Sequence, residues 1–109
     1  MDSERPFLLL RVTPRHEDRD EFRRWFKLVH LRDVRRIPGF TRIEWGETPR
    51  GSTFGIYTFE SAEAVQATLN SPQAAYARGT WDQWSARLEE FFIEMYAPLF
   101  PLPIYQSNN

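Results

Sequence analysis

The sequence predicts an α+β domain in which a four-stranded antiparallel sheet carries its helices on one face. The first observation behind this prediction is the order of hydrophobic patterns, which runs strand, helix, strand, strand, helix, strand. The second is the length of 109 residues, which suffices for one hydrophobic core but not for two. The order is that of the ferredoxin-like split βαβ arrangement, so we expect residues 1–109 to form a single domain of that class.

The first strand and the first helix have clear boundaries. A short apolar run, Phe7–Val12, lies between two prolines and is typical of a buried strand. Residues Glu17–Arg36 then follow a helical period, and the large side chains at that spacing are Phe22, Trp25, Phe26, Val29 and His30. We expect the helix to stop at Ile37–Gly39, because a proline disfavours helical geometry before it and a glycine tolerates a turn.

Two strands joined by a turn are predicted next. Residues Phe40–Glu47 alternate in polarity, and Thr53–Phe59 follow after a stretch of turn-forming residues. Strict alternation places Phe40, Arg42 and Glu44 on one face of the second strand and Thr41, Ile43 and Trp45 on the other.

A second helical region and a last strand complete the pattern. Ser61 is a good N-cap for a helix that reaches about Leu69, and Ser71 with Pro72 restarts a helical stretch. This stretch includes Tyr76, Trp81, Trp84 and Leu88. Phe91–Tyr96 is the candidate for the final strand. Within the proline-rich tail, residues 98–109, the part Pro98–Tyr105 is too apolar for a solvated segment, so we predict that it packs on the protein.

The third strand predicts which side chains face the helices. Alternation turns Tyr57 toward the helices and turns Phe54 and Ile56 toward the opposite, helix-free face of the sheet. An apolar sheet face without helices needs a partner, so we expect a homodimer packed through this face.

Several classes of function are disfavoured by the composition. The stretch Arg50–Ser61 resembles an RNA-binding signature, but Ile56 stands where a stacking aromatic is needed, and the net charge is −1. Nucleic-acid binding is therefore not expected. The chain has no cysteine, and its two histidines, His16 and His30, lack a third ligand at recognisable spacing, so we expect no metal site. No apolar run approaches the length of a membrane span, and we expect a cytoplasmic protein with no membrane partner.

Four local patterns carry a resemblance to a known family. They are His30 near the end of the first helix, the turn Pro38–Phe40, the run Ser61–Ala64, and Ser71–Pro72. With the order of elements, they resemble the dimeric α+β barrel superfamily, and within it the EthD-like and antibiotic-biosynthesis-monooxygenase-like branches. The resemblance implies a homodimer and, in many relatives, a cofactor-independent enzyme. Because the superfamily includes monooxygenases, cyclases, isomerases and proteins without assigned activity, the fold does not fix the reaction.

His30 and Tyr57 are the candidate catalytic residues. Both are expected to face the space between the first helix and the sheet, where an imidazole accepts a proton and a phenol donates to a developing oxyanion. In the structural alternative His30 bonds a backbone carbonyl or Asp33, and Tyr57 is an ordinary core residue with a polar tip.

Phe26, Trp45, Tyr76 and Trp84 are the candidate substrate-binding residues, since large aromatics suit a flat apolar ligand. Packing of helices on the sheet explains the same side chains. The sequence thus leaves two functions open. One is a small cofactor-independent cyclase, isomerase or monooxygenase acting on an aromatic or polyketide-like molecule. The other is a non-catalytic dimeric module that binds a small hydrophobic molecule or simply assembles.

Overall fold

The computed structural model describes residues 5–97, so the predicted packing of the tail at 98–109 lies outside the described residues. Its elements are β1 (Phe7–Pro14), a 3-10 turn (His16–Asp18), α1 (Arg19–Trp25), a π-helical turn (Phe26–His30), α2 (Leu31–Arg35), β2 (Phe40–Glu47), β3 (Thr53–Phe59), α3 (Val65–Leu69), α4 (Pro72–Gly79), a 3-10 segment (Thr80–Arg87) and β4 (Leu88–Tyr96).

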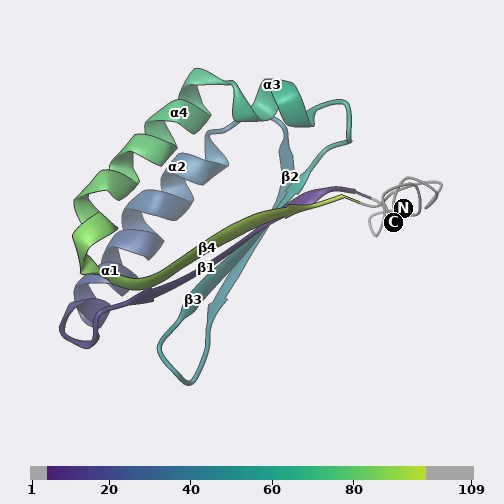
Figure 1. Ribbon diagram of the computed structural model, residues 1–109. Helices are drawn as coiled ribbons and strands as arrows, with labels where there is room; N and C mark the ends of the chain where they lie inside the picture. Colours follow the sequence, from purple (N-terminus) through teal and green to yellow (C-terminus); the bar gives the residue numbers. More distant parts are fainter. Residues whose placement is uncertain (1–4, 98–109) are drawn as a thin grey trace, which may run out of the picture.

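The four strands form one antiparallel sheet in the order β2-β3-β1-β4. Figure 1 shows α1, α2 and α4 together on one side of this sheet. The predicted α+β, ferredoxin-like class is therefore confirmed. The two middle strands of the sheet are β1 and β3, and β3 carries Tyr57.

The first helical segment lies on the sheet through side chains spaced four residues apart. Phe22, Phe26 and His30 are all buried, which is the stripe expected from the sequence. The helical segment ends at Arg35, and the turn that follows includes Gly39, which has a φ of 105°. A side chain there would also collide with Thr68, so only glycine permits this close approach of the turn to α3.

The strict alternation predicted for β2 is wrong at its first residue. Phe40 pairs with Phe59 and Arg42 pairs with Thr58, so Thr41 is an extra residue in the ladder, a β-bulge. The bulge re-aims Phe40 to the helix side of the sheet, where its ring centroid lies 5.9 Å from that of Tyr57.

The last strand is longer than the predicted Phe91–Tyr96. It begins at Leu88, which pairs with Pro14, and the amide of Arg15 donates to the carbonyl of Arg87 over 2.9 Å. The helical region before it tightens into 3-10 geometry rather than continuing as α-helix. Alternation along this edge strand points Phe91 and Ile93 toward the helices, although about half of each side chain stays exposed.

A cluster of aromatic rings forms one end of the core. The fully buried Phe22 ring lies 5.0 Å from Trp84 and 5.8 Å from Trp81, centroid to centroid. The guanidinium of Arg87 stacks over Trp84 at 4.2 Å and pairs with Asp18 at 2.8 Å. This cluster joins α1 to the segment before β4 and fills that end of the space between helices and sheet.

Candidate functional site

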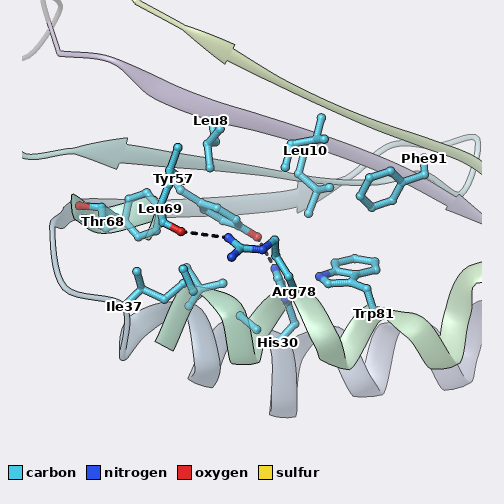
Figure 2. Close-up of a pocket in the computed structure, with 15 residues that line it drawn as sticks. Leu8, Leu10, His30, Ile37, Tyr57, Thr68, Leu69, Arg78, Trp81 and Phe91 are labelled. Atoms are coloured by element: carbon cyan, nitrogen blue, oxygen red, sulfur yellow. Dashed lines mark hydrogen bonds between the residues drawn. The ribbon is translucent and has the colours of Figure 1, made fainter. Parts of the chain in front are cut away.

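A cavity of about 390 Å³ lies between the sheet and the helices. Leu8 and Leu10 of β1, together with Phe91 of β4, approach it from the sheet, and Ile37 and Trp81 approach it from the helical side (Figure 2). Its lining is almost entirely apolar, and its volume is within the range of small-molecule sites. The cavity is therefore suited to an apolar, ring-bearing molecule.

His30 and Tyr57 meet at the inner wall of this cavity. The His30 Nε2 and the Tyr57 hydroxyl oxygen are 2.8 Å apart, which is a hydrogen bond. Each residue is 4% exposed, and both line the cavity. The sequence predicted that the two side chains face one another across a cavity. The structure instead bonds them directly, with the cavity beside the pair (Figure 2).

The His30 imidazole is enclosed by other rings. Its centroid lies 4.8 Å from Phe26, 5.0 Å from Trp81 and 5.6 Å from Trp25. Burial among these rings penalises the charged imidazolium and lowers the pKa of His30 from 6.5 to about 3. His30 is therefore neutral at physiological pH in the free protein.

His30 bonds Tyr57 instead of the partners expected in the structural alternative, which were a backbone carbonyl or Asp33. Asp33 Oδ1 accepts from Arg32 over 3.2 Å instead. Within residues 5–97, His30 Nδ1 has no hydrogen-bond partner at all. The imidazole is also the last residue of the π-helical turn Phe26–His30, a local widening that is frequent at functional sites.

The position of the Tyr57 ring depends on the space left by Gly55, two residues before it. Gly55 and Tyr57 share the helix-facing side of β3, and the tyrosine ring lies back over Gly55. A Cβ at Gly55 would come within 2.6 Å of the Tyr57 hydroxyl oxygen. Sequence reasoning missed this role of Gly55. The signal for it in the sequence is a glycine two residues before a tyrosine in the same strand, because such residues lie on the same face of the sheet. Burial raises the pKa of Tyr57, so the phenol also stays neutral.

None of the four candidate substrate-binding residues lines the cavity. Phe26 lies behind His30, and the Trp45 ring packs 5.8 Å from Phe26. Trp84 is buried against Phe22. Tyr76 is 61% exposed and lies beside Pro72, in a different surface hollow.

Other residues supply the walls that sequence reasoning did not assign. Phe40 reaches the cavity because of the bulge at Thr41, and Phe91 reaches it because it pairs with Val12 of β1, whose side chain lies in the core. Trp81 and Arg78 reach it from the helical side. Arg78 is the one ionised side chain among the lining residues.

Within residues 5–97, no helix is long and apolar enough to cross a membrane. No group of three or more His, Cys, Asp or Glu side chains gathers there in a way that would hold a metal ion. The cytoplasmic location stays a prediction.

No protein-family model matches the chain, and no curated protein matches it. Solved structures do share its fold. An EthD-family protein from Bacillus halodurans is 14% identical with a TM-score of 0.69, covering 86% of this chain and 99% of its own. SnoaB, a cofactor-independent oxygenase from Streptomyces nogalater studied as a mutant, is 18% identical with a TM-score of 0.64, covering 86% and 92%. A putative antibiotic biosynthesis monooxygenase from Nitrosomonas europaea is 14% identical with a TM-score of 0.62, covering 90% and 93%. At such identities the likeness concerns the fold.

The position of Tyr57 can be tested through Gly55. In Gly55→Ala the new methyl group displaces the phenol and strands the buried His30 nitrogen, so we expect the free energy of unfolding to fall by about 1–3 kcal/mol. Gly79→Ala is the matched control, because nothing lies within 4 Å of a Cβ there. Urea denaturation of both variants gives the comparison. Equal stability of Gly55→Ala and the wild type would show that the phenol does not depend on Gly55.

The neutral state of His30 predicts a specific loss of stability in acid. Only the unfolded chain takes up this proton as the pH falls below 6.5, so stability is lost from there down to about pH 3. Between pH 7 and pH 5, the unfolding free energy of the wild type should fall by about 2 kcal/mol more than that of His30→Asn. His16→Asn, which removes the exposed histidine, should behave like the wild type. The same pH dependence in all three proteins would contradict the buried neutral imidazole.

Proposed function

We propose that this protein is a small cofactor-independent enzyme that acts on an aromatic or polyketide-like molecule, with His30 and Tyr57 as its acid/base pair. The observation that carries the proposal is the 2.8 Å bond between these side chains on the wall of an otherwise apolar cavity. Burying two polar groups on the wall of an apolar cavity is costly for stability, and acid/base chemistry gives them a use.

Because His30 Nδ1 has no hydrogen-bond partner within residues 5–97, one choice of donor and acceptor is favoured for the bond between His30 Nε2 and the Tyr57 hydroxyl. If Tyr57 donated its proton to Nε2, the imidazole hydrogen would sit on Nδ1 as a buried donor without an acceptor. Orphaned buried N–H groups are rarer than under-satisfied acceptors. We therefore infer that Nε2–H donates to the Tyr57 oxygen at rest, which leaves the phenol proton free to point at a ligand.

In this resting direction, Tyr57 donates to a ligand oxygen and stabilises negative charge as an enolate or phenolate forms. In the reversed direction the neutral imidazole carries its hydrogen on Nδ1, so Nε2 accepts the Tyr57 proton while the Tyr57 oxygen takes a proton from the substrate. The products of that step are a substrate anion, a neutral Tyr57 and an imidazolium, so the net charge is unchanged. The anion beside the imidazole raises its pKa and offsets the burial penalty at the moment when it is needed.

The fold neighbours add support from their names. One is described as a cofactor-independent oxygenase and another as a putative antibiotic biosynthesis monooxygenase. Oxygenation of an enolisable aromatic ketone needs only deprotonation by the protein, because the resulting carbanion reduces O₂ itself. The His30–Tyr57 pair supplies that one requirement, so monooxygenase chemistry is the reaction class we favour over cyclisation or isomerisation.

A non-catalytic binding module is the second candidate, and one observation favours it. An imidazole whose pKa lies at about 3 is a weak base in the free protein, and its bond to Tyr57 gives both groups a hydrogen-bond partner without any reaction. In that case the cavity holds a small hydrophobic molecule, and Tyr57 serves only as a hydrogen-bond donor to it.

We also propose a homodimer packed through the helix-free face of the sheet. Leu9 pairs with Ile56 at the centre of this face, and both side chains are only half-buried within one chain. The Phe54 ring lies over Gly46, which extends the apolar strip across β2. Two copies related by a two-fold axis would cover this strip, as an isologous contact requires.

Turnover of a defined substrate tests the enzyme proposal. With anthrone and O₂ we expect oxidation of the ring methylene to a ketone, giving one anthraquinone and one water for each O₂ consumed. Tyr57→Phe and His30→Asn should each lower kcat by about a hundredfold or more. Tyr76→Phe, which alters an exposed tyrosine outside the cavity, is the matched control. Oxygen uptake that is absent in the wild type, or equal in all four proteins, would leave the binding module as the better account.

The dimer is tested by a charge placed at its centre. Ile56→Asp buries an unpaired carboxylate in the proposed interface and should convert a dimer into a monomer. Leu28→Asp makes the same change at a side chain that is 64% exposed on the helical side, and should remain dimeric. Sedimentation equilibrium at micromolar concentration measures both masses. A monomeric wild type would overturn the proposal.

A further inference from the structure

Arg78 gives the cavity an ionic group that its apolar walls do not explain. It projects from α4, is exposed, and is the one ionised side chain among the lining residues. Its Nη1 donates to the backbone carbonyl of Leu69 over 3.1 Å. Figure 2 shows the side chain reaching from the helix across the gap toward Leu69, beside the His30–Tyr57 pair.

The guanidinium has no carboxylate partner within residues 5–97. Arg11, Arg23 and Arg87 each pair with an acidic side chain, whereas Arg78 bonds only the carbonyl. A guanidinium has five N–H donors in a planar fork, so most of its donors remain available to an incoming group. The carbonyl bond fixes one side of the fork and so orients the rest at the cavity.

We propose that the ligand is an aromatic carboxylate, whose ring system fills the apolar cavity and whose carboxylate is bound by Arg78. This rests on the proposed function, because it assigns the class of molecule that reaches the His30–Tyr57 pair. One planar guanidinium can donate two parallel hydrogen bonds to one carboxylate and balances its single charge. A phosphate ester fits less well, because no second cationic side chain among residues 5–97 lines the cavity to neutralise its further charge.

Two probes of the same shape isolate the contribution of the charge. 2-Naphthoate is ionised at pH 7.5, whereas 2-naphthalenemethanol carries a neutral hydroxyl group on the same ring system. Their dissociation constants are measured by isothermal titration calorimetry with the full chain. We expect the wild type to bind 2-naphthoate at least about tenfold more tightly, since a charge-assisted contact is stronger than a neutral one. Raising the salt concentration should narrow this difference.

The variants assign the preference to Arg78. Arg78→Gln should bind the two probes about equally and should bind 2-naphthalenemethanol as the wild type does. Arg78→Lys keeps the charge without the fork, so an intermediate preference is expected, and it replaces Arg78→Gln if that variant is unstable. Arg24→Gln is the control for net charge, because Arg24 is exposed on α1 and does not line the cavity.

Each other result overturns the inference. It fails if the wild type does not prefer 2-naphthoate, if neither probe binds at millimolar concentration, or if Arg78→Gln retains the preference. These outcomes are separate from those of the turnover test. An Arg78-dependent preference without anthrone oxidation would retain the anionic ligand and reject the enzyme. Oxidation without any anion preference would retain the enzyme and reject the carboxylate.

Discussion

The hydrogen bond between His30 and Tyr57 is the interaction on which the rest of the site depends. Each group alone would be a buried polar side chain among aromatic rings, and leaving such a group unpaired costs about 1–3 kcal/mol. Each is the hydrogen-bond partner of the other over 2.8 Å, so a helical residue and a strand residue far apart in the sequence are fixed relative to one another. The π-helical turn at Phe26–His30 and the bare backbone at Gly55 are the local adjustments that bring the two atoms together.

The cavity beside this bond combines apolar walls with very few polar contacts. The phenol proton of Tyr57 and the guanidinium of Arg78 are two groups able to orient a ligand, and they differ in kind. A neutral donor at the buried wall recognises an oxygen on which charge develops, whereas a cation at the exposed side recognises charge already present. The molecule that we propose for this cavity is flat, apolar and anionic at one end.

The sequence allowed the fold and the central pair to be predicted, because both depend on periodicity. Helical spacing placed His30 on the buried stripe with Phe22 and Phe26, and strand parity turned Tyr57 to the same side. The cavity walls were harder, because they depend on departures from periodicity. The bulge at Thr41 is such a departure, and it turned Phe40 to the cavity side of the sheet. Tyr76 is exposed because of the way α4 is rotated about its axis against the sheet. The aromatic composition of the sequence does not reveal this rotation.

The protonation state of His30 tests the central claim most directly. Two-bond ¹H–¹⁵N correlation spectra of protein labelled at its two histidines distinguish the neutral tautomers from the imidazolium, and His16→Asn assigns the signals. The account predicts that His30 stays neutral from pH 7 to pH 5, with its hydrogen on Nε2. An imidazolium within that range, or a hydrogen on Nδ1 at rest, would contradict it.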